Sequence, residues 1–215
     1  MLVASGVALL YIRFQVMGSN LPVFTNFDNP ASYEDAPVKQ LTWSYLVAVN
    51  LWLLLAPSQL CCDWTMKTVP LVTTLSDLRN VATLGVATLL LGLGLAAIKK
   101  SPVSRRERNL LTLALSLLAL PFLPASNLFF PVGFVVAERV LYLPSMGFCL
   151  LVAYGLDKLY NATSSHHQVM VKAAFAFLIA IHSAKTFLRN YDWKDELSIF
   201  KSGNYIFLKR TFIHN

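Results

Sequence analysis

Long stretches without a charged residue constrain this chain more than any other feature of its sequence. Four of them are Gln40–Cys62, Asn80–Ile98, Asn109–Ala137 and Val140–Leu156. About 20 apolar residues in an α-helix cross the hydrocarbon core of a bilayer, so stretches of this kind indicate membrane spans. Only 13% of the residues are charged, whereas about 25% is usual in soluble domains. The sequence therefore predicts an all-α polytopic membrane protein. It excludes a disordered chain, a nucleic-acid-binding arm and most soluble enzymes.

The uncharged stretches divide the chain into a multi-span transmembrane domain, residues 1–188, and a polar tail, residues 189–215. The predicted spans are about 1–17, 80–98, 109–126, 140–158 and 169–188. The segment 41–75 is apolar but interrupted by Pro57 and Pro70. Two interpretations of it stay open, a single crossing or a re-entrant or interfacial hairpin.

A basic segment predicts the orientation of the spans. It lies between two apolar stretches and contains Lys99, Lys100, Arg105, Arg106 and Arg108. In a soluble protein it would suggest a nucleic-acid patch, but between spans the positive-inside rule favours a cytoplasmic loop. Loop 127–138 and the tail then lie on the opposite side. If 41–75 does not cross, loop 18–39 lies there too. The sequon Asn161–Thr163 becomes cytoplasmic, and we expect it to be unmodified.

The sequence contains neither a metal-binding motif nor a catalytic motif of a soluble enzyme. The cysteines are Cys61, Cys62 and Cys149, an odd number without metal-ligand spacing. No phosphate-binding glycine loop, nucleophile elbow or zinc-protease motif is present. We therefore expect no metal site and no nucleic-acid partner.

Glu138 and Arg139 are the most informative polar residues, because they interrupt a long uncharged region. Charges at membrane depth are costly unless they are paired or face water. They fit a mutually neutralising pair or a polar cavity in which Arg139 contacts an anionic group. Asp63–Trp64 suits an interfacial anchor or a site, and Asp28–Asn29 suits a turn or a cavity loop.

Several motifs in order closely resemble one family, the transmembrane and tetratricopeptide-repeat O-mannosyltransferases that act on cadherins. The motifs are Phe24–Ala31 (FTNFDNPA), Leu41–Leu46 (LTWSYL), Asn50–Pro57 (NLWLLLAP), Cys62–Trp64 (CDW), Ala137–Gly147 (AERVLYLPSMG) and Arg189–Glu196 (RNYDWKDE). The resemblance covers residues 1 to about 204. It implies a GT-C-like helix bundle in the endoplasmic reticulum membrane, followed by lumenal tetratricopeptide repeats.

The resemblance also implies substrates and site residues. The donor would be dolichyl-phosphate-mannose, a lipid-linked sugar, and the acceptor a Ser or Thr hydroxyl of a cadherin-type protein. No further cofactor is implied. By resemblance, Arg139 is the candidate for the donor phosphate, with Glu138 and Tyr142 nearby. The candidate residues of the lumenal cavity wall are Asp28, Asn29, Asp63 and Trp64.

Both ends of the chain depart from the family pattern. The family's acidic pair lies upstream of Met1, so the catalytic residues are unknown, and residues after Tyr205 do not continue a repeat array. We therefore expect a fragment or isoform truncated at both ends. A non-catalytic membrane scaffold is the alternative function. A transporter ranks last, because the sequence shows no convincing internal repeat.

Overall fold

The computed structural model describes residues 2–17, 24–58, 60–65, 68–98 and 104–203. Its elements are α1 (Leu2–Met17), η1 (Pro30–Tyr33), α2 (Val38–Leu55), α3 (Arg79–Ile98), α4 (Arg105–Ala119), η2 (Leu123–Ala125), η3 (Glu138–Leu141), α5 (Tyr142–Ala162) and α6 (Ser165–Asp192). Residues 196–203 are also helical. No strand occurs in these ranges, so the predicted all-α fold is confirmed. Interpretations concerning residues 99–103 and 204–215 lie outside the described residues.

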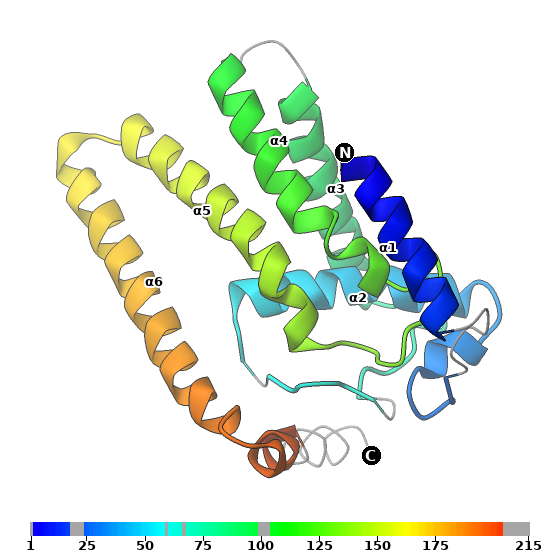
Figure 1. Cartoon of the computed structure of the whole chain (residues 1–215). Coiled ribbons are helices and arrows are strands. Elements are labelled where there is room, and N and C mark those ends of the chain that lie inside the picture. Colours follow the sequence, from blue (N-terminus) through cyan, green and yellow to red (C-terminus); the bar gives the residue numbers. More distant parts are fainter. Residues whose placement is uncertain (1, 18–23, 59, 66–67, 99–103, 204–215) are drawn as a thin grey trace.

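The elements gather at two ends of the molecule (Figure 1). The C-terminal end of α3, the start of α4 and the α5–α6 turn lie at one end. At the other end lie α2, residues 193–203 and three loop segments, 24–37, 56–78 and 120–141. We call these three segments the loop layer. The loops that carry most of the candidate site residues are therefore neighbours in space, although they are far apart in the sequence.

Within the described ranges, five helices are long and apolar enough to cross a membrane. In the most apolar stretches of α3 and α6, no residue is buried inside the described structure. On α3, for example, Leu84 and Leu91 are both more than half exposed. Apolar surface on this scale is stable in hydrocarbon and unfavourable in water. The exposed faces therefore identify a membrane protein.

Helix α2 lies crosswise to α3, α4 and α5, along the loop-layer end of the bundle (Figure 1). One side of it buries Leu46 and Leu53, while Trp52 and Leu55 are exposed. The chain that follows it returns without regular structure and is fixed to α2, since the Val72 N–H donates to Thr42 Oγ1 at 3.0 Å. Both interpretations of segment 41–75 stay open, because α2 is also long and apolar enough to cross a membrane.

Helices α4 and α5 pack closely because small residues face each other between them. Helix α4 begins with a capping box in which Ser104 and Glu107 each bond the other's backbone N–H. Ala114 is fully buried, and the Gly147 backbone lies directly against it. Pro144 stands in the first turn of α5, where a missing N–H breaks no helical bond. Small residues of this kind let membrane helices approach at backbone distance.

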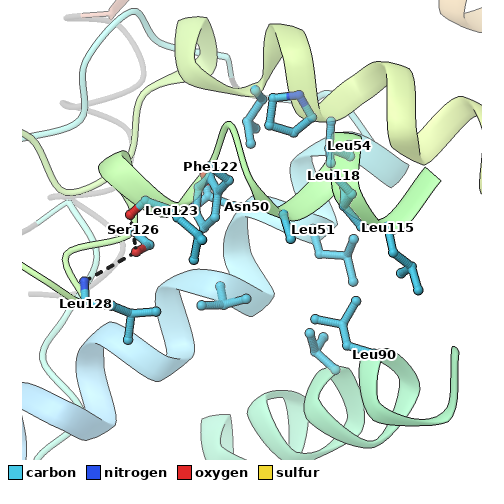
Figure 2. A pocket seen from close by; sticks show the side chains of 15 residues that line it. Asn50, Leu51, Leu54, Leu90, Leu115, Leu118, Phe122, Leu123, Ser126 and Leu128 are labelled. Carbon is cyan, nitrogen blue, oxygen red and sulfur yellow. Dashed lines mark hydrogen bonds between the residues drawn. The ribbon is translucent and has the colours of Figure 1, made fainter. Parts of the chain in front are cut away.

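An apolar pocket of about 360 Å³ lies between α2, α3, α4 and the start of α5 (Figure 2). Its walls are leucines and other apolar side chains, with Asn50 and Ser126 as the polar exceptions. Asn50 donates to the Leu46 carbonyl at 2.8 Å, and its own Oδ1 is buried without a partner. The Asn50 side chain is therefore held against the preceding turn of its own helix.

Candidate functional site: a charged cluster in the loop layer

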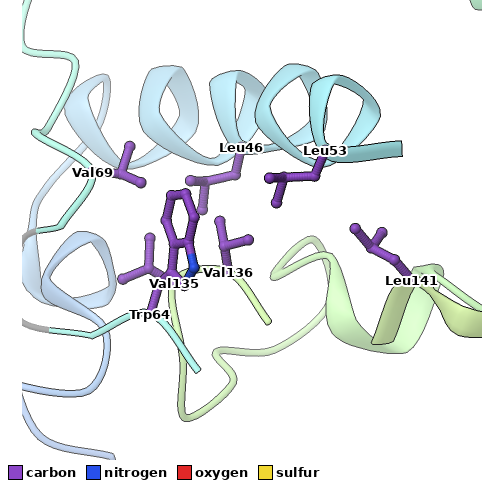
Figure 3. Close-up of a cluster of buried hydrophobic side chains, with 7 residues drawn as sticks. All are labelled: Leu46, Leu53, Trp64, Val69, Val135, Val136 and Leu141. Atoms are coloured by element: carbon purple, nitrogen blue, oxygen red, sulfur yellow. The ribbon is translucent and has the colours of Figure 1, made fainter. Parts of the chain in front are cut away.

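An apolar cluster beneath the loop layer ties two of its segments to α2 (Figure 3). The cluster consists of Leu46, Leu53, Trp64, Val69, Val135, Val136 and Leu141. Trp64 is only 2% exposed, and its backbone forms an isolated antiparallel bridge with that of Val136. The Trp64 N–H donates to the Val136 carbonyl at 2.7 Å, and the Val135 N–H donates to the Trp64 carbonyl at 2.8 Å. The residues next to Trp64 and Val136 are thereby fixed in register.

Two buried asparagines join the third loop segment to the same layer. Asn29 Nδ2 donates to Asn127 Oδ1 at 2.7 Å and to the Val132 carbonyl at 3.1 Å. Asn127 has a φ of 62°, a left-handed conformation that asparagine tolerates better than most residues. Its Oδ1 also accepts the Val132 N–H at 3.0 Å. Asn29 therefore holds loops together.

The register of the bridge brings Asp63 to Arg139. Arg139 Nε and Nη2 donate to the two carboxylate oxygens of Asp63, at 3.0 Å and 2.9 Å. The guanidinium also lies over the Phe134 ring, 5.9 Å from its centroid. The Arg139 side chain is 54% exposed, and its Nη1 has no hydrogen-bond partner among the described residues. Arg139 is thus oriented by a carboxylate and keeps a free donor toward solvent.

Glu138 takes a different partner, Arg189 at the end of α6. Arg189 Nε lies 3.1 Å and 3.2 Å from the two Glu138 carboxylate oxygens, and Nη2 donates to the first of them. The Trp193 Nε1–H adds a bond of 3.1 Å. Glu138 and Arg139 therefore do not neutralise each other, and of the two interpretations left open by the sequence, the mutual pair is not the one observed. They are adjacent in the sequence, but each is paired with a residue more than fifty positions away.

An open pocket of about 510 Å³ borders Arg139. Tyr142, which is 72% exposed, and Leu143 line it from the start of α5. The rest of its wall is apolar and comes from Pro121, Pro124, Ala125, Val132, Phe134 and Val140. A cation at the edge of an apolar pocket suits a molecule that combines an anionic group with a hydrocarbon chain.

Burial raises the pKa of Asp63, although the neighbouring Arg139 opposes that rise. Burial also raises the pKa of Cys62, and the negative charge of Asp63 adds to the shift. The carboxylate facing Arg139 is therefore held less firmly in its charged form than a free aspartate. Among the described residues, no group of three or more histidine, cysteine or acidic side chains is arranged for a metal ion.

The structure brings only part of the predicted site together. Asp63, Glu138, Arg139 and Tyr142 lie in one region, whereas Trp64 and Asn29 are buried in packing roles. Asp28 is partly exposed and accepts hydrogen bonds from the Thr25 hydroxyl and N–H, which lower the pKa of its carboxyl. Sequence reasoning missed Arg189. Two signals were available, the position of Arg189 at the end of an apolar stretch and its place as the first residue of the motif Arg189–Glu196.

Comparisons with known proteins agree with the resemblance seen in the motifs. Residues 18–91 match the family model described as protein O-mannosyl-transferase TMTC, DUF1736. The whole chain is 51% identical to protein O-mannosyl-transferase Tmtc3 of Drosophila melanogaster and covers 23% of that protein. The human protein O-mannosyl-transferase TMTC3 is 52% identical over 94% of the chain, with 22% of its length covered. Mouse TMTC1 is 44% identical over 91% of the chain, with 21% covered. No solved structure matches.

Lipid-facing helices with a charged loop layer at one end define a polytopic membrane protein with a polar site beside its apolar surface. The chain belongs to the TMTC family, whose curated members are named protein O-mannosyl-transferases. It spans roughly a quarter or less of each of these three relatives.

Proposed function

We propose that these residues form the donor-binding part of a membrane O-mannosyltransferase. The donor is dolichyl-phosphate-mannose, and the acceptors are Ser or Thr hydroxyls of cadherin-type proteins in the lumen of the endoplasmic reticulum. The observation that carries this proposal is Arg139, a carboxylate-oriented guanidinium with a free Nη1 at the edge of an apolar pocket. The names of the relatives, protein O-mannosyl-transferases, support mannosyl transfer to protein.

Arg139 suits the phosphate of such a donor for two reasons. A guanidinium stays charged at every physiological pH and donates in a fixed plane. When mannose leaves the donor, negative charge grows on the dolichyl phosphate, and a cation held in place beforehand stabilises that charge. The apolar wall next to Arg139, including Tyr142 and Leu143, accommodates the first part of the lipid chain. The base that deprotonates the acceptor hydroxyl is not assigned to any of these residues.

The proposal places the loop layer and the tail on the lumenal side. We expect a glycosylation cassette inserted after Phe129, an exposed loop-layer residue, to be modified in microsomes. The same cassette inserted after Ser164, in the α5–α6 turn at the opposite end, should remain unmodified. Sensitivity to endoglycosidase H in a gel-shift assay provides the measurement. Modification after Ser164 and not after Phe129 would invert the orientation and refute the donor site.

Donor binding by the purified chain tests the proposal directly. A charged hydrogen bond contributes about 1.5–3 kcal/mol, so Arg139→Ala should weaken binding of dolichyl-phosphate-mannose about 10- to 100-fold. The donor affinity of Arg139→Lys should lie between those of Arg139→Ala and the wild type, because lysine keeps the charge but lacks the planar guanidinium. Arg105→Ala is the matched control, since Arg105 is an exposed cation at the other end of the bundle. Equal binding by Arg139→Ala and wild type would leave the scaffold function as the better explanation.

Donor binding should also depend on pH through Asp63. Asp63 orients Arg139 for the donor phosphate only while its carboxyl is charged, and the pKa of that carboxyl is raised above the ordinary 3.8. The donor phosphodiester stays ionised, so binding should weaken as pH falls through the pKa of Asp63. Above that pKa binding should be level. Asp63→Asn should abolish the slope between neutral and acidic pH. The measurement is the dissociation constant of the donor as a function of pH, in the wild type and in Asp63→Asn. An equal slope in the two proteins would contradict the role of Asp63 in the pH dependence.

A further inference from the structure

Arg189 is a buried cation that the donor-binding argument does not use. Its side chain is 10% exposed, and that of its partner Glu138 is 11% exposed. Besides Glu138, Arg189 Nη1 donates to Asp192 at 2.7 Å and to Ser202 Oγ at 2.8 Å. One guanidinium therefore joins three parts of the chain, namely the start of η3, the end of α6 and the helix at residues 196–203.

The helix at residues 196–203 lies against the loop layer. Ile199 is 7% exposed, and Gly203 is buried close to Cys61. A Cβ added at Gly203 would lie 2.8 Å from Cys61 Sγ. The Cys61 carbonyl in turn accepts the Glu138 N–H at 3.4 Å. The tail, the Cys61 segment and Glu138 are thus in one connected set of contacts.

Loss of Arg189 would leave Glu138 as a largely buried carboxylate with Trp193 as its remaining side-chain partner among the described residues. A charge at such a site without its ionic partner is strongly unfavourable, so we expect Glu138 to turn toward solvent. Glu138 opens η3, and Arg139 is the next residue in that short helix. Because the two residues share this short backbone, a shift of η3 after the loss of the Glu138–Arg189 ion pair would also displace Arg139 relative to Asp63.

From these contacts we propose that Arg189 is a positioning residue for the donor site: through Glu138 it holds Arg139 in place, and through Ser202 it makes that geometry depend on docking of the tail. This proposal rests on the proposed function, because it assigns Arg189 a role in binding the donor that Arg139 contacts. Arg189 itself touches no part of the donor.

The first test measures binding of dolichyl-phosphate-mannose to the purified chain. Arg189→Ala should weaken binding about tenfold, a usual effect for partners that orient a ligand-binding side chain. Arg189→Lys keeps the charge but not the fork, and it should restore most of the affinity. Lys194→Ala, which removes an exposed cation from the same region, should bind like the wild type. Helix content and melting temperature of each variant separate an effect on the site from a failure to fold.

The second test measures docking of the tail. In a chain with Cys62→Ser and Cys149→Ser, Gly203→Cys places a thiol within disulfide reach of Cys61. Diamide, which accepts the two electrons and two protons released, should form this disulfide quickly. Adding Arg189→Ala should slow its formation about tenfold or more, while Arg189→Lys should not.

The outcomes separate the two proposals. Wild-type binding by Arg189→Ala together with weak binding by Arg139→Ala overturns the role of Arg189 and leaves the donor site intact. Wild-type binding by Arg139→Ala overturns the donor site itself. If Arg189→Ala does not fold, the Arg189→Lys variant is used to test the positioning role of Arg189. A tenfold loss of binding in that variant, at an unchanged disulfide rate, would contradict positioning through the tail.

Discussion

Replacing Gly147 with alanine is expected to destabilise the bundle by about 1–3 kcal/mol, the usual range for overpacking a close contact. The new Cβ would lie 2.3 Å from the Ala114 carbonyl oxygen and 2.4 Å from the Leu118 backbone nitrogen. Both are backbone atoms of α4, which cannot turn aside as a flexible side chain can. The two helices must therefore move apart, and Ala114 loses its tight packing.

The measurement is thermal or denaturant unfolding of the purified chain in detergent. Gly155→Ala is the matched control, because Gly155 lies on the same helix and an added Cβ there meets nothing within 4 Å. In a helix interior that control substitution should be neutral or slightly stabilising, since alanine has the higher helix propensity. Equal stability of the two variants would show that α4 and α5 do not approach at backbone distance.

Replacing Trp64 with alanine should have the largest effect on stability, about 3–5 kcal/mol. The indole is almost fully buried in the apolar cluster, between α2 and the Val135–Val136 segment (Figure 3). Its removal leaves a cavity at the bridge that sets the register of Asp63 and Arg139. Donor binding should fall together with stability, because the ion pair of the site depends on that register.

Trp52→Ala tests whether burial causes the effect. Trp52 belongs to α2, the helix against which Trp64 packs, and its side chain is 59% exposed. Its replacement should change the unfolding free energy by less than about 0.5 kcal/mol in detergent. Trp64→Phe retains most of the apolar volume, so its free energy of unfolding should lie between those of the wild type and Trp64→Ala. A loss at Trp52 as large as that at Trp64 would contradict the arrangement of α2 described above.

The uncharged stretches were sufficient to predict an all-helical membrane protein, because a bilayer imposes a length and a polarity on any span. The lack of charge over Asn80–Ile98 and the basic residue before it predict α3 almost to its ends. The orientation of α2 was not predictable in the same way. An apolar helix of 18 residues satisfies the composition of a span and of an interfacial helix alike. Its contacts with Trp64 and Val72 show how the following chain is fixed to it, which the composition could not predict.

The candidate site was predictable in its residues but not in its pairing. Glu138 and Arg139 were conspicuous as charges inside an apolar region, and their adjacency suggested a pair. In the fold, adjacent residues of η3 point to different neighbours, and each finds a partner brought close by the tertiary structure. Contacts between residues so distant in the sequence leave no local pattern. For that reason the sequence did not identify Arg189 as the partner of Glu138, or Asn127 as the partner of Asn29.

The bonds within the loop layer have a consequence for how the protein responds to its lipid surroundings. Loops 24–37, 56–78 and 120–141 are fastened to one another through Asn29–Asn127 and Trp64–Val136. When hydrophobic thickness changes, spanning helices accommodate it by tilting, at a modest cost for each ångström of mismatch. Such tilting bends the joints where helices enter the layer and leaves the fastened loops as one unit. The spacing between Asp63 and Arg139 should thus be the same in thin and thick bilayers.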